Sequence, residues 1–198
     1  AFVTHQGNFH WNVAPFVLMN LPASFQMLMS QVFQGLTFKF LICYIDDCLI
    51  FSSSFDEHLS HLSEVFDRLR KAKLRLHPLK CVFAVERINY LGHVLSPSGV
   101  EVDPGKVDAV RTFPQPKNLK AVRAFLGFVG YYRKFIKDFS KIASPMYQLL
   151  KKDQEFQFNE ECVKAFETLK HALLTTPVLA YPDMQRPFIV TTDASTYS

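Results

Sequence analysis

Residues 38–52 read Phe-Lys-Phe-Leu-Ile-Cys-Tyr-Ile-Asp-Asp-Cys-Leu-Ile-Phe-Ser. Two short runs rich in apolar and aromatic residues stand on either side of Asp46 and Asp47. Such runs around a polar pair are typical of a β-hairpin, so the sequence predicts two strands that meet at Asp46–Asp47. A two-residue hairpin turn usually contains Asn-Gly or Asp-Gly, because its backbone needs positive φ. An Asp-Asp pair is a poor turn former, which suggests that its carboxylates serve another purpose.

The adjacent carboxylates of Asp46 and Asp47 indicate a metal site. Two neighbouring negative charges repel each other, and apolar strands beside them weaken the screening by solvent. A divalent cation would offset that repulsion, and hard oxygen ligands on a turn suit Mg²⁺. A two-metal site would need one more carboxylate from another strand. A solvent-exposed acidic turn is the alternative, but Tyr44 and the flanking strands favour the metal.

Helices are predicted on both sides of this hairpin. Pro22 opens a helical pattern that reaches about Phe33. After the hairpin, Ser54 and Glu57 have the S-x-x-E spacing of a capping box, and the helix that follows is expected to end at Pro78. Its buried face is expected to consist of residues spaced by three and four positions: Leu59, Leu62, Phe66 and Leu69.

The rest of the chain predicts two strands and two further helices. The strands cover Lys80–Val85 and Ile88–Leu95, and the proline-containing residues Pro114–Asn118 form a linker. The helices cover about 119–136, with Leu119, Val122, Leu126 and Val129 on one side, and about 159–174. Helices and antiparallel strands in this order predict an α+β fold.

The charge distribution points to a polyanionic partner. The net charge is only +4, but nine Lys and Arg residues and one acidic residue lie between Lys117 and Lys152. A solvated helix face normally mixes charges of both signs, so this segment favours a surface that follows phosphates. A basic face without a partner remains the alternative.

Other compositional features exclude several classes of protein. The four cysteines form no CxxC pair, so free thiols in a reducing compartment are expected rather than a zinc site. His58 and His61 are predicted to be a solvated pair without a role. No run of about 20 apolar residues predicts a membrane span, and no signal peptide is recognisable. An intracellular protein is therefore expected, and both ends suggest a piece of a longer chain.

Four motifs in register resemble the reverse transcriptases of gypsy-type LTR retrotransposons. Tyr44-Ile45-Asp46-Asp47 resembles their YxDD signature, and Pro15–Gln26 resembles the PFGLxNAPxxFQ segment beside the incoming nucleotide. Tyr90-Leu91-Gly92-His93 is similar to the hairpin that grips the primer terminus. Leu126–Ile136 is similar to the LGxxxYYRxFI stretch of the thumb. The resemblance covers essentially the whole chain.

The resemblance implies roles for individual residues. Asp46 and Asp47 would be catalytic and would hold two Mg²⁺ ions, or Mn²⁺ in their place. The nucleotide pocket would include Phe16, Val17 and Gln26. Nucleic acid would be contacted by Tyr44, Leu91, Gly92, His93, Arg123, Gly127 and Tyr131. The last three are spaced i, i+4, i+8 and share one helix face, although a glycine there also suits helix–helix packing.

The resemblance also implies a domain order and a fold. Residues 1–95 would form part of the fingers and the palm of a right-hand polymerase, an antiparallel sheet with packed helices. Residues 96–180 would form a mainly helical thumb and connection. Residues 181–198 would begin a ribonuclease H-like domain, with Asp193 as its first metal-binding carboxylate.

The implied function is RNA-directed DNA polymerisation, the addition of dNTPs to a primer 3′-OH on an RNA or DNA template during retrotransposition. The partners would be the remainder of the Pol polyprotein, including integrase, within a cytoplasmic particle or the nucleus. Val17 and Leu21 depart from the family's Gly and Ala, and the first catalytic aspartate would precede residue 1. This chain alone is therefore expected to be inactive. The alternative is a decayed or host-recruited relic that binds nucleic acid or protein without catalysis.

Overall fold

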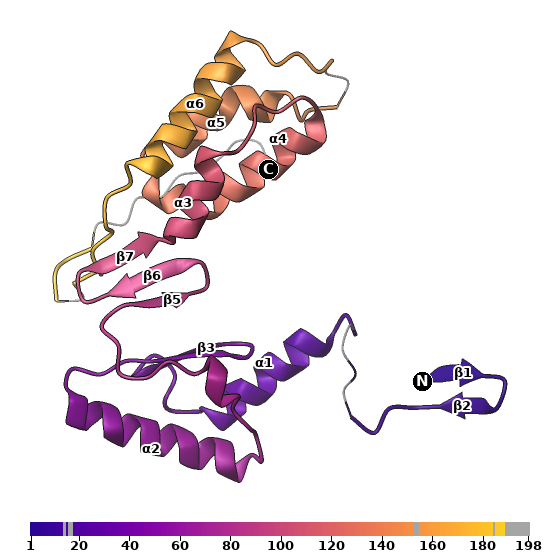
Figure 1. Cartoon of the computed structure of the whole chain (residues 1–198), viewed down its shortest axis with the longest axis vertical. Helices are drawn as coiled ribbons and strands as arrows, with labels where there is room; N and C mark the ends of the chain where they lie inside the picture. The colour runs from indigo at the N-terminus through magenta and orange to yellow at the C-terminus, as the bar shows by residue number, and fades with distance from the viewer. Residues whose placement is uncertain (14, 16–17, 153–154, 184, 189–198) are drawn as a thin grey trace. The chain divides into compact units, whose positions relative to one another are not determined.

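The computed structural model describes residues 1–13, 15, 18–152, 155–183 and 185–188. The chain divides into two compact units, Ala1–Val85 and Glu86–Ser198. Figure 1 traces the helices and strands of each unit. Antiparallel strands and helices occur in both units, which confirms the predicted α+β class. No helix of the described part is long and apolar enough to cross a membrane.

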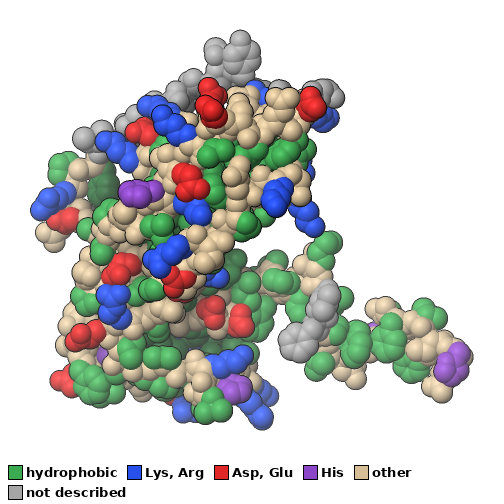
Figure 2. All heavy atoms as spheres, turned by 45° about the horizontal axis from the view of Figure 1, so that its top comes forward, with side chains coloured by type: hydrophobic (Ala, Val, Ile, Leu, Met, Phe, Trp, Pro, Cys, Tyr) green, Lys and Arg blue, Asp and Glu red, His purple; other side chains and the backbone are tan. Residues whose placement is uncertain are grey.

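The first unit begins with a small hairpin for which the sequence gives no clear signal. Strands β1 (Phe2–Thr4) and β2 (Gly7–Phe9) pair in antiparallel fashion. The ring of Phe2 stacks on that of Phe9 at 5.7 Å between centroids and lies 5.1 Å from that of Trp11. Residues 1–13 carry no Lys, Arg, Asp or Glu, and Figure 2 shows hydrophobic side chains in green and histidine in purple on this hairpin, among uncharged polar ones in tan.

Helix α1 (Leu21–Val32) and the central hairpin follow. Strands β3 (Leu41–Tyr44) and β4 (Asp47–Ile50) pair antiparallel, with Tyr44 opposite Asp47. The two residues in the turn are therefore Ile45 and Asp46, and the predicted Asp46–Asp47 turn is wrong by one residue. The core of this unit consists of residues from α1, the chain after it, β3 and α2: Met29, Phe33, Leu36, Leu41, Val65 and Leu69.

Helix α2 (Phe55–Lys71) begins at the predicted capping residue. The amide of Glu57 donates to Ser54 Oγ at 3.3 Å, and the Glu57 carboxylate accepts from the Ser53 amide at 2.7 Å. The predicted buried face is only partly correct, because Leu59 is 50% exposed whereas Val65 is 2% exposed. The helix ends at Lys71, well before Pro78, and Lys73 follows with a positive φ.

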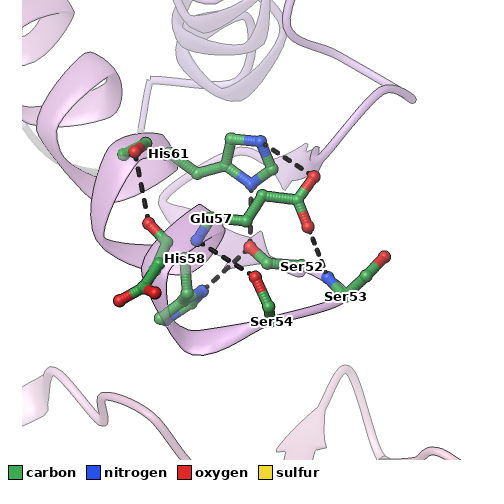
Figure 3. A network of polar contacts seen from close by, with 8 residues as sticks. Ser52, Ser53, Ser54, Glu57, His58 and His61 are labelled. Carbon is green, nitrogen blue, oxygen red and sulfur yellow. Dashed lines mark hydrogen bonds and ion pairs between the residues drawn. The ribbon is translucent and has the colours of Figure 1, made fainter.

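Two histidines near the start of α2 fix this helix to the end of β4. His58 Nδ1 and His61 Nδ1 both lie within hydrogen-bond distance of Ser52 Oγ, at 3.1 and 2.7 Å (Figure 3). A hydroxyl has one hydrogen, so Ser52 donates to one ring and accepts from the other. The His61 ring also stacks on Phe40 at 3.8 Å. The prediction of a solvated pair without a role is therefore wrong.

The second unit opens with a three-stranded antiparallel sheet. Its strands are β5 (Ile88–Tyr90), β6 (His93–Ser96) and β7 (Gly99–Val102), in that order. The single strand predicted over Ile88–Leu95 is instead a hairpin. The strand predicted over Lys80–Val85 is absent, because residues 81–85 have no regular structure and follow a 3₁₀ turn at Pro78–Lys80.

Helices complete the second unit and supply most of its core. They are α3 (Pro104–Arg111), α4 (Leu119–Tyr131), α5 (Phe139–Gln148) and α6 (Glu160–Leu174), with a 3₁₀ turn at Arg133–Phe135. The predicted helices at 119–136 and 159–174 correspond to α4 and α6, whereas α3 and α5 were not predicted. Figure 1 shows the sheet leading into α3, with α4, α5 and α6 packed together. Phe125, Val129, Met146 and Leu169 are among the residues of their shared core.

Candidate active site and nucleic-acid interface

The turn between β3 and β4 holds a residue in an unusual conformation. Ile45 has φ of +54°, and Asp46 is not among the described residues with positive φ. Two-residue hairpin turns that need a positive φ at the first central residue normally have Gly, Asn or Asp there. A β-branched residue in this region is a genuine outlier. Such strain persists only where the surroundings over-determine it, and it clusters at functional sites.

Gln26, on helix α1, provides that restraint. Its Oε1 accepts a hydrogen bond from the Ile45 amide at 2.6 Å, and its Nε2 donates to the Cys43 carbonyl at 3.4 Å. One side-chain amide thus satisfies a donor and an acceptor of the backbone around the turn. The structure brings Gln26 to the predicted catalytic turn, and a contact between Gln26 and a nucleotide stays a prediction.

The carboxylates of the turn face solvent. Tyr44, Asp46 and Asp47 are all exposed, so the expectation of repulsion beside an apolar layer is wrong. Within the described ranges, no group of three or more His, Cys, Asp or Glu side chains could hold a metal ion. Two adjacent carboxylates on a held turn still fit a hard divalent cation that takes its other ligands from water, substrate or further carboxylates.

Two cysteines lie directly behind this turn. Cys43 and Cys48 are opposite each other in the β3–β4 register, and Cys48 Sγ donates to Cys43 Sγ at 3.3 Å. This hydrogen bond lowers the pKa of Cys43, against the opposing effects of burial and the two aspartates. The same bond, with burial, raises the pKa of Cys48. Cys43 Sγ in turn donates to the Ile45 carbonyl at 3.4 Å.

The β5–β6 turn, predicted to grip the primer, is also held from a distance. Leu91 and Gly92 have φ of +48° and +72°, the pattern of a type I′ turn. The Tyr131 hydroxyl donates to the Leu91 carbonyl at 2.7 Å, and the Tyr132 hydroxyl donates to the Gly92 carbonyl at 2.9 Å. His93 Nδ1 lies 2.9 Å from the Leu91 carbonyl and must carry a hydrogen to bond with it.

The side chain of His93 is turned into the protein. Its ring lies between 5.4 and 5.8 Å from the rings of Tyr131, Tyr132 and Phe135, and its Nε2 is buried without a hydrogen-bond partner among the described residues. Burial lowers the pKa of His93. The ring is thus packed against aromatic side chains of the same unit, and a contact between the His93 side chain and nucleic acid stays a prediction.

The predicted nucleic-acid face of α4 is exposed. Arg123, Gly127 and Tyr131 all reach solvent, whereas the opposite face, with Val122, Phe125, Leu126 and Val129, is buried. A Cβ added to Gly127 would meet nothing within 4 Å. Packing against another helix therefore does not explain this glycine in the part of the chain that the structure describes. An approaching partner outside the chain would explain it.

All nine cationic side chains between Lys117 and Lys152 are exposed. Among them, Lys141 lies 3.4 Å from the carboxylate of Asp138, the only acidic residue of that segment. Such surface pairs contribute little. Three further predicted site residues, Phe16, Val17 and Asp193, lie outside the described residues.

Comparisons with known proteins place these features in a family context. Residues 1–95 match the family "Reverse transcriptase (RNA-dependent DNA polymerase)". Residues 158–198 match the "RNase H-like domain found in reverse transcriptase".

Curated relatives match along almost the whole chain. The Pol polyprotein of transposon 297 from Drosophila melanogaster is 42% identical over 196 residues, 98% of this chain and 18% of the relative. That of transposon 412 from the same species is 36% identical, over 98% of this chain and 16% of the relative. The Tf2-3 polyprotein of Schizosaccharomyces pombe is 34% identical, over 98% of this chain and 15% of the relative. The chain thus spans less than a fifth of each of these three proteins.

Solved structures share the fold. A foamy viral protease-reverse transcriptase in complex with dsDNA has a TM-score of 0.78 at 23% identity, over 89% of this chain and 37% of that one. The same type of protein in complex with an RNA/DNA hybrid has a TM-score of 0.74 at 23% identity, over 86% of this chain and 23% of that one.

Proposed function

The chain belongs to the reverse transcriptases of LTR-retrotransposon Pol polyproteins, and on that premise we propose that it supplies the catalytic turn and a nucleic-acid surface of an RNA-directed DNA polymerase. The reaction is the addition of dNTPs to a primer 3′-OH on an RNA or DNA template. The longer polyprotein, with its remaining polymerase, ribonuclease H and integrase parts, would be the active enzyme.

One observation carries this proposal. Gln26 fixes the strained Ile45 turn through hydrogen bonds of 2.6 and 3.4 Å, and the turn presents Asp46 and Asp47 to solvent. These carboxylates would hold the divalent metal that the family generally uses. When bound, two Mg²⁺ ions, or Mn²⁺ in their place, activate the attacking hydroxyl and stabilise the leaving group. Tyr44 would pack against the primer end, and Phe16 and Val17 would shape the nucleotide pocket.

A second surface supports the nucleic-acid part of the proposal. The exposed face of α4 combines Arg123 and Tyr131 with the bare backbone of Gly127. A cation, an aromatic ring and a glycine let a helix lie close along a groove of a duplex. The foamy viral relatives were solved with dsDNA and with an RNA/DNA hybrid. The turn at Leu91 and Gly92 would position the primer through its backbone.

The predicted segments fit this function. Residues 1–95 would belong to the fingers and palm, residues 96–180 to the thumb and connection, and residues 181–198 to the ribonuclease H-like part. In that last segment, Asp193 would be a metal ligand of the second enzyme activity.

Primer extension tests the catalytic role of the turn. We expect a chain extended upstream into the polyprotein to incorporate dNTPs with Mg²⁺, and Asp46→Asn to reduce the rate by about a hundredfold or more, since metal ligands account for several kcal/mol of transition-state stabilisation. Asp67→Asn, which removes one exposed carboxylate on α2, is the matched control. Equal rates for wild type and Asp46→Asn would show that the turn is not catalytic.

A non-catalytic role in binding nucleic acid is the second candidate. The nine exposed cations and the open face at Gly127 favour it, because neither needs a metal. A salt titration of duplex binding by this chain should show affinity that falls steeply with ionic strength. Arg123→Ala should reduce the salt dependence, and Gly127→Leu should weaken binding without loss of folding. Absent or salt-independent binding would discard this candidate.

A further inference from the structure

The two cysteines behind the catalytic turn form a close pair with no role in the proposed polymerase chemistry. Cys43 and Cys48 are directly opposite across β3 and β4, and their sulfurs are 3.3 Å apart. In a hairpin with a two-residue turn, the residues that close the turn exchange backbone hydrogen bonds. The next pair is then of the non-hydrogen-bonded kind, in which opposite side chains come closest.

This placement suits a disulfide. Non-hydrogen-bonded pairs have Cα atoms about 4.5 Å apart, within the range of about 4.4–6.8 Å that disulfides span. Bringing the sulfurs to bonding distance therefore needs side-chain rotation and little backbone movement. Both side chains are half-buried, so a small reagent in solution can reach them.

The other two cysteines, Cys81 and Cys162, do not lie next to another thiol. Cys81 Sγ donates to the His77 carbonyl at 3.4 Å, and Cys162, which is buried, donates to the Pro145 carbonyl at 3.6 Å. Each therefore contacts a backbone carbonyl instead of a second thiol. The pairing at the catalytic hairpin is specific to Cys43 and Cys48.

We propose that Cys43 and Cys48 form an oxidation site that closes to a disulfide, with a hydroperoxide as the two-electron oxidant. One thiol attacks the peroxide, breaks its O–O bond and becomes a sulfenic acid, with release of one water when the peroxide is H₂O₂. The second thiol then attacks that sulfur and displaces a second water as the S–S bond forms. In total, two thiols and one H₂O₂ give one disulfide and two waters. A thiol reductant reverses the change by exchange.

Formation of the disulfide would also change the contacts that hold the catalytic turn, an effect that rests on the proposed polymerase function. The Cys43 thiol donates to the Ile45 carbonyl, and the Cys43 carbonyl accepts from Gln26. Oxidation removes the thiol hydrogen and draws the sulfur towards β4. Cys43, whose carbonyl is one of the two contacts of Gln26, would then be held by new covalent geometry close to Asp46 and Asp47. We expect slower nucleotide incorporation in the oxidised form.

Simple packing is the competing explanation. Both cysteines lie against the core of the first unit, and free cysteine often serves as a small apolar residue. The two explanations differ in what peroxide produces, so the first experiment needs no activity. The folded chain is treated with H₂O₂, its remaining thiols are alkylated, and its peptides are analysed by mass spectrometry.

The oxidation site predicts a linked Cys43–Cys48 peptide that dithiothreitol separates, formed faster than any change at Cys81 or Cys162. Cys48→Ser should give no link and should leave Cys43 as a sulfenic acid. Oxidation of the four cysteines at similar rates, or no link at Cys43, would overturn the proposal in favour of packing.

The second experiment follows incorporation by the extended chain before and after peroxide. We expect a several-fold fall in the incorporation rate that dithiothreitol restores in the wild type, and no peroxide-dependent fall in the double variant Cys43→Ser/Cys48→Ser, which has neither thiol. An unchanged rate in a chain that carries the verified disulfide would overturn the effect on the turn and leave the oxidation site standing. No incorporation by the reduced wild type would count against the polymerase proposal instead.

Discussion

The hairpins β3–β4 and β5–β6 both contain a turn residue in an unfavourable backbone conformation, and different side chains stabilise the two turns. Each has a two-residue turn, and each places a bulky apolar residue at positive φ, Ile45 at +54° and Leu91 at +48°. That conformation is costly for such residues. In each case the turn is held by side chains from a helix or its end, 19 residues away for Gln26 and 40 for Tyr131.

The two turns differ in the side chains that remain exposed once the turn is held. Gln26 bonds an amide and a carbonyl around the first turn, and the carboxylates of Asp46 and Asp47 remain exposed. At the second turn, tyrosine hydroxyls and His93 bond carbonyls, and no acidic side chain is present in Tyr90–His93. The first turn therefore offers carboxylates for the proposed metal site, whereas the second offers none.

Removal of the Gln26 amide should give the largest change. Gln26→Leu leaves the half-buried Ile45 amide without its acceptor and the Cys43 carbonyl without a donor, so the free energy of unfolding should fall by about 1–3 kcal/mol. Urea unfolding measures it, with Gln31→Leu on an exposed position of α1 as the matched control. If both variants unfold alike, Gln26 does not restrain the turn.

Removal of either tyrosine hydroxyl should lower the free energy of unfolding by less than Gln26→Leu does, and the two tyrosines should differ. Tyr132→Phe removes a donor from a buried side chain and should cost about 1 kcal/mol. Tyr131, which is 55% exposed, lets water replace its hydroxyl, so Tyr131→Phe should cost less. Tyr147→Phe, at an exposed site on α5, is the control for both in thermal or urea unfolding. An equal or larger loss for Tyr131→Phe would contradict this ranking.

The pH dependence should distinguish Tyr132 further. Burial raises the pKa of Tyr132 to about 12 from an ordinary value near 10. A raised pKa means that the folded state holds the proton more tightly, so its contribution is complete below pH 10 and is lost as pH rises towards 12. Unfolding measured across this range should show that loss in the wild type and not in Tyr132→Phe.

Below neutral pH, the free energy of unfolding should depend on His93, with a smaller change than the one expected for Tyr132. Burial lowers the pKa of His93, with a further contribution from the charge of Lys134. The unfolded chain then binds a proton at a higher pH than the folded chain does. Stability from the neutral ring is therefore complete above pH 6.5 and falls as pH drops below it. His93→Phe should flatten this slope in unfolding measurements, and an unchanged slope would show that the ring titrates freely.

Local signals account for the parts of the fold that the sequence predicted. The capping box at Ser54 and Glu57 marked the start of α2, and the buried positions of α4 followed its helical period. By contrast, α5 has an Asp138 start in left-handed conformation and Pro145 in its interior, two features that disguise a helix. Asp103 followed by Pro104 is a typical helix start, so the sequence does contain a signal for α3. Gly92 likewise indicates the turn of the second hairpin.

The site was less accessible to sequence reasoning than the fold. A turn with Ile at positive φ contradicts local preference, so the position of the first turn was wrong by one residue. The contacts of Gln26 and the tyrosines with the turns are tertiary, and no local pattern encodes them. The convergence of two histidines on Ser52 depends in the same way on how α2 meets β4.

The central claim is that Asp46 and Asp47 together make nucleotide addition dependent on a divalent metal. The most direct test is the single-nucleotide incorporation rate of the upstream-extended chain across a Mg²⁺ titration, with Asp67→Asn as the control. We predict a rate that rises and saturates in the wild type and control, and no rise at any Mg²⁺ concentration when both aspartates are asparagine. Parallel titration curves for the three proteins would contradict the claim.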